Sequence, residues 1–505
     1  MDQHEVWHQP TLDKVANAIG PFFLRSAVYL FLISFVGLFY LLNGPVLLGH
    51  YDLGWHLAAG DLIRERNSIP VQDPWSFTHN AKTWFNLSWL WDALASATFQ
   101  YAGFGGLVLF AVLSGAAIIG ILTSICLGFG ASPIAVCIAV FLGCLLYPAY
   151  EASPNIYLAV SPNTCTMLFC VVFYRECLSR TRWLVLPPLM ALWANLHGGF
   201  LLGFFVIGVF FCVALLRRAW PDLRIYALAG IGSFAATFVN PLGWKIYTGA
   251  AATMGHFVQG NIGEWLSYYH NMEMPGSLPG ILYMLSFVAL ELHFRNSKPI
   301  PLETRLMSWL FLLLGLYQFR YIAFFFIFST GPLALHIDRL LPARFTNGDF
   351  RGPLLAAGIV GLCTLPIGYL RVAPDLALPE MLSREDAGYL QKHFAGARVL
   401  NNWNVGGYLI FRTRGEVPLF VDGRAATAYP DDLLRDYFRL VSWDVDQTAW
   451  DLVLDKYRID AVLWVKAHDQ LRHFLVEKRG WREQYIGAYE TVYVRPDFAD
   501  VAKKP

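Results

Sequence analysis

Long apolar runs separated by short polar loops fill most of the chain before residue 373. An apolar run of about 20 residues crosses the hydrocarbon core of a membrane as a helix. The two short runs at 183–196 and 199–216 can also form one broken hairpin, so the number of crossings lies between about ten and twelve. We predict a mostly α-helical, polytopic membrane domain over 1–373, with about eleven transmembrane helices at 24–43, 106–126, 131–148, 161–176, 183–196, 199–216, 225–239, 277–294, 304–318, 321–337 and 353–371.

Basic residues occur on one side of this pattern. The loops after the fourth, sixth, eighth and tenth predicted spans carry Lys and Arg, whereas the short odd-numbered loops are nearly free of them. By the positive-inside rule the N-terminus is then cytoplasmic, and the long first loop and the C-terminal segment are extracytoplasmic. The residues that decide this orientation are Arg175, Arg180, Arg182, Arg217, Arg218, Arg224, Arg295, Lys298, Arg305, Arg339, Arg344 and Arg351.

The segment 374–505 has a different pattern, in which short strand-like runs alternate with helical ones. The helical patterns lie at 382–394, 430–441 and 446–456. Such alternation predicts a soluble α/β domain on the extracytoplasmic side. The candidate strands are VLNNW, GYLIF, VPLFVDG, DAVLWV and ETVYVR.

Composition supports a membrane protein and excludes one class of partner. Of the 505 residues 56% are hydrophobic and only 15% are charged, whereas a soluble domain carries about 25% charged residues. The net charge of +1 gives no basic surface for a nucleic acid. The first apolar run follows a polar leader without a small-residue cleavage site, so we expect it to be retained as the first helix.

The long first external loop, 48–105, contains two candidate interfacial helices. The first follows Asp52 directly, and the second covers 86–101. Asp52 therefore has two interpretations, a catalytic carboxylate at the membrane surface or an N-cap of the following helix. Asp73 precedes a proline in the same loop, where a turn is the usual structural role.

Four further ionisable residues fall at the external face in this topology, and such residues at membrane depth are functional candidates. His56 lies in the first loop, and His197 lies in an N-L-H-G-G turn where it can also act structurally. Glu264, beside a tryptophan, has an interfacial anchor as its alternative. Arg320 can bind a lipid phosphate bidentately or only extend to the headgroups. By contrast, Asp422 and Arg424 are expected in a strand-end turn.

Several motifs together resemble bacterial membrane proteins of the GT-C glycosyltransferase superfamily. They are D-L-x-W-H from Asp52, I-P-x-x-D-P-x-S-F-T, W-x-N-x-x-W-L, LWANLHGGFLLG, NPLGWKIY, GEW, NVGGYLIF and FVDGRA. The resemblance implies a GT-C-like fold and a sugar donor on a polyprenyl phosphate. It also implies that Asp52, directly after the first span, is the catalytic base.

On this basis we expect an inverting glycosyltransferase of the bacterial inner membrane that uses an extracytoplasmic glycan, lipid or protein as acceptor. Asp52 would be catalytic, and Arg320, His56 and His197 would bind the donor phosphate. Asp73 and Glu264 would bind the acceptor or a divalent metal ion. A transporter or flippase of a lipid-linked substrate and a non-catalytic envelope assembly protein are the alternatives. Nucleotide-binding, serine-hydrolase and zinc-protease motifs are absent from the sequence.

Overall fold

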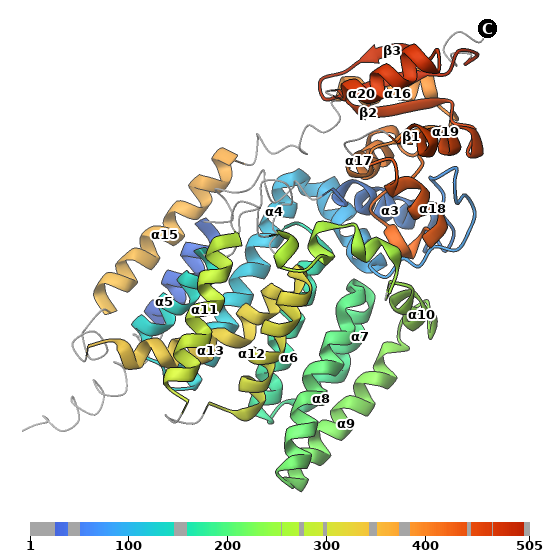
Figure 1. The fold of residues 1–505 in the computed structure, drawn as a ribbon. Helices are drawn as coiled ribbons and strands as arrows, with labels where there is room; N and C mark the ends of the chain where they lie inside the picture. Colours follow the sequence, from blue (N-terminus) through green and yellow to red (C-terminus); the bar gives the residue numbers. More distant parts are fainter. Residues whose placement is uncertain are drawn as a thin grey trace, which may run out of the picture.

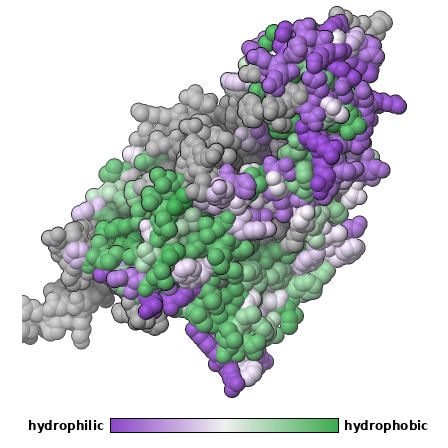
Figure 2. All heavy atoms as spheres, in the orientation of Figure 1, coloured by the Kyte–Doolittle hydropathy of each residue, from purple (hydrophilic) through white to green (hydrophobic). Residues whose placement is uncertain are grey.

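The computed structural model describes residues 26–38, 51–145, 159–253, 255–271, 277–295, 300–342, 351–372, 384–441, 446–466 and 468–498. It confirms a mostly helical protein with a small sheet near the C-terminus (Figure 1). Hydrophobic residues cover the helical bundle, and hydrophilic residues cover the C-terminal part (Figure 2).

Helices form the membrane part because the sequence is apolar there and backbone groups in lipid must be paired within each segment. Among the described residues, three helical stretches are long and apolar enough to cross a membrane, Trp89–Gly128, Gly198–Leu216 and Phe319–Leu340. The number of eleven crossings stays a prediction, and the predicted spans 24–43 and 131–148 lie partly outside the described residues. The helices are Ser26–Leu38, α4 Trp89–Gly128, α5 Pro133–Leu145, α6 Pro162–Ser179, α7 Leu186–Leu196, α8 Leu201–Leu216, α9 Trp220–Thr237, α11 Ser277–His293, α12 Leu302–Tyr317, α13 Ile322–Leu340 and α15 Arg351–Val372.

The first external loop forms the two expected helices, but the second is continuous with a membrane helix. The first is α3, Leu53–Arg66, and the second is the beginning of α4, which changes direction at Gly103 where φ is +59°. The two helices pack closely because Gly60 has no side chain. A Cβ atom there would lie 2.0 Å from the carbonyl oxygen of Asp92. The loops predicted to be external also contain α10 Lys245–Ala252 and the 3-10 turns η3 Phe257–Gly260, η4 Gly263–Trp265, η5 Tyr269–Asn271 and η6 Phe319–Tyr321.

The C-terminal part is a four-stranded sheet in the order β1-β2-β4-β3, with helices around it. Strand β1 is parallel to β2, and the other pairs are antiparallel. The strands are β1 Val399–Asn401, β2 Ala461–Val465, β3 Arg482–Ile486 and β4 Glu490–Val494. The helices are α16 Arg384–Phe394, α17 Trp403–Thr413, α18 Asp431–Phe438, α19 Gln447–Lys456 and α20 Asp469–His473, with the short turns η8 Ala425–Thr427 and η9 Phe474–Lys478.

Two of the predicted strands are wrong. GYLIF belongs to α17, which starts because the side chain of Asn402 accepts a hydrogen bond from the amide of Asn404 and so caps the helix. VPLFVDG does not form a strand. Of this run only Leu419 makes bridges, and both are isolated, one to Ser76 and one to Val399 of β1. VLNNW, DAVLWV and ETVYVR do contain strands, whereas β3 was not predicted.

The C-terminal part lies directly on the first external loop (Figure 1). Helix α17 crosses α3 where two glycines meet, and a Cβ atom on Gly54 would lie 2.3 Å from the carbonyl oxygen of Gly407. The backbone of Leu419 also exchanges hydrogen bonds with Trp75 and Phe77, at 3.2 and 3.1 Å. These contacts make the tail a wall of whatever site the first loop contains.

Candidate active site

Asp52 occupies the N-cap position of α3, but its side chain does not cap the helix. The N-cap interpretation of this carboxylate is therefore not what the structure shows. Its carboxylate instead lies against the loop of the tail that contains Gly423. A Cβ atom built on Gly423 would lie 1.6 Å from Asp52 Oδ1, so only glycine leaves room for the carboxylate.

The electrostatic surroundings of Asp52 suit a base that works near neutral pH. Burial raises the pKa of this carboxyl to about 6. His56 opposes the shift, and Asp422 adds to it. A carboxylate with a pKa near the working pH can both accept a proton and release it again.

His56, one turn along α3, is buried and held on both sides. Its Nδ1 lies 2.6 Å from Oδ1 of Asp92, and Asn86 donates to the other oxygen of that carboxylate at 2.8 Å. The ring stacks on Trp55, with 3.6 Å between centroids. Asp92 and Asn86 were not among the candidates from the sequence, although a carboxylate in an apolar helix was a signal for them.

His197 lies between α7 and the 3-10 turn η2, Gly198–Phe200, where it accepts a hydrogen bond from the amide of Gly199. Its Nδ1 is 2.6 Å from Oγ1 of Thr166, a hydroxyl that itself accepts from the indole of Trp193. Burial, with the charges of Arg320 and His56, lowers the pKa of His197 to about 3. The ring is therefore neutral at pH 7, and with Nδ1 accepting, its proton lies on Nε2.

Arg320, in η6, stacks over Trp265, with 4.1 Å between the guanidinium carbon and the ring centroid. Its Nη1 is 3.9 Å from Oε1 of Glu264. Arg320 acts electrostatically on His197, and so does His56, which in turn acts on Asp52. These interactions connect five of the six candidate residues, all except Asp73.

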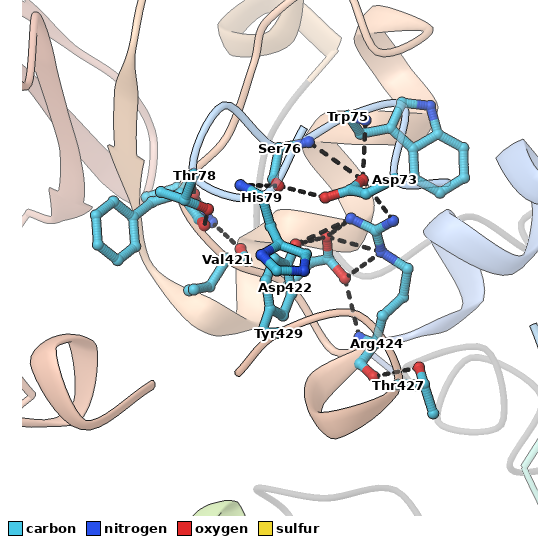
Figure 3. A network of polar contacts seen from close by, with 12 residues as sticks. Asp73, Trp75, Ser76, Thr78, His79, Val421, Asp422, Arg424, Thr427 and Tyr429 are labelled. Atoms are coloured by element: carbon cyan, nitrogen blue, oxygen red, sulfur yellow. Dashed lines mark hydrogen bonds and ion pairs between the residues drawn. The ribbon is translucent and has the colours of Figure 1, made fainter. Parts of the chain in front are cut away.

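Asp73 is the centre of a different, buried network (Figure 3). Its carboxylate accepts from Nη1 of Arg424 at 2.7 Å, from the amides of Trp75 and Ser76, and from the Ser76 hydroxyl. Arg424 also binds both oxygens of Asp422. The expected strand-end turn of the tail is therefore an ion cluster that joins the tail to the first loop.

Neither proposed metal ligand is well placed for a divalent ion. Both oxygens of Asp73 are already in hydrogen bonds, and Glu264 faces Arg320. Within the described ranges, His, Cys, Asp and Glu side chains form no group of three or more that fits a metal ion. Mg²⁺ and Ca²⁺ sites require several oxygen ligands, and Asp73 and Glu264 do not supply such a set in this arrangement.

No family model and no curated protein matches the sequence. Solved structures do match. The apo oligosaccharyltransferase of Archaeoglobus fulgidus has a TM-score of 0.58 at 10% identity, with 89% of this chain and 70% of that chain covered. ArnT from Cupriavidus metallidurans in the apo state has a TM-score of 0.50 at 14% identity, and the match covers 95% of this chain and 98% of that chain. The chain has the GT-C fold.

A further structure with the GT-C fold is the Archaeoglobus oligosaccharyltransferase AglB in complex with an inhibitory peptide and a dolichol-phosphate. It has a TM-score of 0.55 at 11% identity, and the match covers 87% of this chain and 70% of that one. Identities this low establish the fold, and a fold does not by itself specify a reaction. The GT-C fold does place this chain among multi-pass membrane proteins.

Proposed function

We propose that this protein is an integral membrane glycosyltransferase that transfers a sugar from a polyprenyl-phosphate donor to an extracytoplasmic acceptor. The observation that supports this most directly is the Asp52 carboxylate, which caps no helix and has a pKa of about 6. It lies at the end of a predicted span, where a lipid-linked donor would enter. The dolichol-phosphate in the AglB complex is consistent with a donor of this chemical class.

In the proposed reaction Asp52 takes the proton from an acceptor hydroxyl as the hydroxyl oxygen attacks the anomeric carbon. The bond between that carbon and the phosphate oxygen breaks, and the lipid phosphate leaves with the electron pair. A single displacement of this kind inverts the anomeric centre. Proton acceptance by a positioned carboxylate contributes about 10²–10⁴-fold in rate.

The departing phosphate needs compensating charge on the same side. Arg320 supplies a guanidinium whose fork matches phosphate oxygens, and Trp265 fixes its plane. His197 supplies a neutral Nε2–H donor, and His56 is a second ring that acts electrostatically on both His197 and Asp52. Donors that are fixed before the reaction stabilise developing charge most effectively.

The two other candidates keep a different place in the proposal. Asp73 and Glu264 are each bound to an arginine, so we assign them to the walls of the site, where an acceptor would pass. The orientation predicted by the basic loops puts this site and the tail outside the cytoplasm. Reporter fusions check it, because a periplasm-active reporter after residue 380 should be active and one at Ser179 should be silent.

Asp52→Asn tests the assignment. Asn has the same size but accepts no proton at this pH, so the variant should accumulate normally and lose at least about 100-fold of its sugar transfer. Asp61→Asn is the matched control, since Asp61 lies two turns further along α3 and bonds only to Ser96 and, loosely, Arg64 in the contacts described. Transfer at the wild-type rate by Asp52→Asn would remove Asp52 as the base.

A further inference from the structure

Asp92 and Asn86 are two buried polar residues next to His56, and the proposed reaction assigns them no role. Asp92 and Asn86 lie at the start of α4 and just before it, and they are 0% and 2% exposed. Burying a carboxylate costs free energy unless it is paired and hydrogen-bonded. Asp92 is paired with His56, and Oδ1 of Asp92 lies 2.6 Å from Nδ1 of the ring.

The packing around this pair leaves His56 one orientation. Trp55 stacks on one face of the ring, and Trp91 meets it edge-on, with 4.8 Å between centroids. Gly60 allows α3 and α4 to approach closely enough for the contact. The ring is thus held by two tryptophans and one hydrogen bond.

The two oxygens of Asp92 have different partners, and this decides the tautomer of His56. Oδ2 accepts from the Asn86 amide at 2.8 Å, which leaves Oδ1 for the ring. A carboxylate only accepts, so Nδ1 of His56 must donate in either protonation state. The remaining nitrogen, Nε2, is then the one that a reacting group meets.

We propose that Asp92 is a positioning residue, which fixes the orientation of the His56 ring with a proton on Nδ1. The proposal rests on the proposed function for its consequence in catalysis. With Nδ1 bound to Asp92, Nε2 is the ring nitrogen left to exchange a hydrogen bond or a proton with a reacting group. Asp92 itself touches no substrate.

Asp92→Asn separates this role from simple packing. The Asn86 amide still needs an acceptor, so the oxygen of the new side chain remains there and its NH₂ group faces His56. Nδ1 must then accept, so the ring proton moves to Nε2. We expect kcat to fall by about 10²-fold or more, with the KM for acceptor little changed.

A double-mutant cycle with His56→Gln gives the decisive measurement. If Asp92 acts through His56, the double variant loses no more activity than His56→Gln alone, because residues that act as a unit are non-additive. Losses that multiply, or full activity in Asp92→Asn, would overturn the proposal. If Asp92→Asn does not accumulate, Asn86→Ser can replace it, because this variant removes the hydrogen bond that holds Oδ2 of Asp92. It is then combined with His56→Gln in the same double-mutant cycle.

A second measurement needs no activity. Deuterium exchange at the C2 position of the His56 ring, followed by mass spectrometry against pH, reports the protonation of that ring. The pH dependence of this exchange should change in Asp92→Asn and should be unchanged in Asp61→Asn. An unchanged pH dependence in Asp92→Asn would overturn the proposal. If the wild type transfers no sugar while the pH dependence changes, the proposed function has failed and the positioning role has not.

Discussion

Replacing Arg424 with methionine removes the cation that joins the tail to the first external loop. Arg424 is 2% exposed and binds Asp73, both oxygens of Asp422 and the Tyr429 hydroxyl. Burial alone would lower its pKa, but Asp422, Tyr429 and Asp73 hold the pKa of Arg424 well above its ordinary value. Methionine keeps much of the volume and leaves two buried carboxylates without their counter-ion.

The size of the effect follows from that imbalance. Removing one partner of a buried ion pair costs about 3–5 kcal/mol. The rings of Trp75 and Trp84 lie 4.8 and 5.0 Å from the guanidinium carbon, and losing this contact adds about 0.5–2 kcal/mol. For a cooperative unit of 150–250 residues, 1 kcal/mol corresponds to about 2–4 °C, so Tm should fall by roughly 6 °C or more.

Thermal unfolding in detergent, with limited proteolysis of the junction between loop and tail, measures the loss. Arg479→Met is the matched control, since Arg479 bonds to Asp451 and Asp455 on a partly exposed surface. Exposed pairs contribute about 0–1 kcal/mol. Adding Asp73→Asn to Arg424→Met should recover part of the loss. A Tm shift no larger than that of Arg479→Met, with no recovery in the double variant, would refute the reasoning.

Four further predictions concern the proposed site. Because burial raises the pKa of Asp52 to about 6 and a base works ionised, transfer should rise as pH increases through about 6. Because the pKa of Asp52 is raised by burial, the ionised carboxylate destabilises the folded state at pH 7. Asp52→Asn should therefore raise the free energy of unfolding at pH 7 by about 1–3 kcal/mol, and Tm should rise with it. Gly423→Ala places a methyl group on the Asp52 carboxylate and should cost about 10²-fold in transfer, whereas Gly388→Ala, which meets nothing within 4 Å, should cost none. Arg320→Lys keeps the charge but loses the bidentate fork and the flat stack on Trp265, so the KM for donor should rise while accumulation is unchanged; an unaltered KM in a membrane assay would contradict phosphate binding.

The sequence predicted the elements that its local pattern determines. Apolar runs identified the helical bundle, and three helices of the tail, α16, α18 and α19, lie within about three residues of their predicted bounds, whereas α17 and α20 were not predicted as helices. GYLIF was wrong because a short apolar run fits a buried helix as well as a strand, and the cap at Asn402 decided it. VPLFVDG was wrong because its backbone makes only isolated bridges, to β1 at Val399 and to the first loop at Ser76, a segment more than 300 positions away.

The candidate site shows the same division. Topology alone placed Asp52, His56, His197 and Arg320 on one face, and the structure links them electrostatically. The role of Asp92 depends on a close approach of α3 and α4 that Gly60 allows, which no local pattern reveals. The cluster around Arg424 joins two segments that are distant in sequence, so each half looked like an ordinary turn.

The way in which the tail is held bears on the chemistry. Water attacking the same anomeric carbon would hydrolyse the donor, so an inverting transferase must keep water from the base. A mobile lid does this only while it is closed. Here Gly423 rests on Asp52, and the cluster at Arg424 and the crossing of Gly54 and Gly407 hold the loop that carries it. A buried ion cluster is by itself weak evidence for stability. This cluster does, however, fix the position of the loop with Gly423 relative to the Asp52 carboxylate. In the proposed mechanism the tail would then shield Asp52 from water on the side of Gly423, and the acceptor hydroxyl would reach Asp52 from another side.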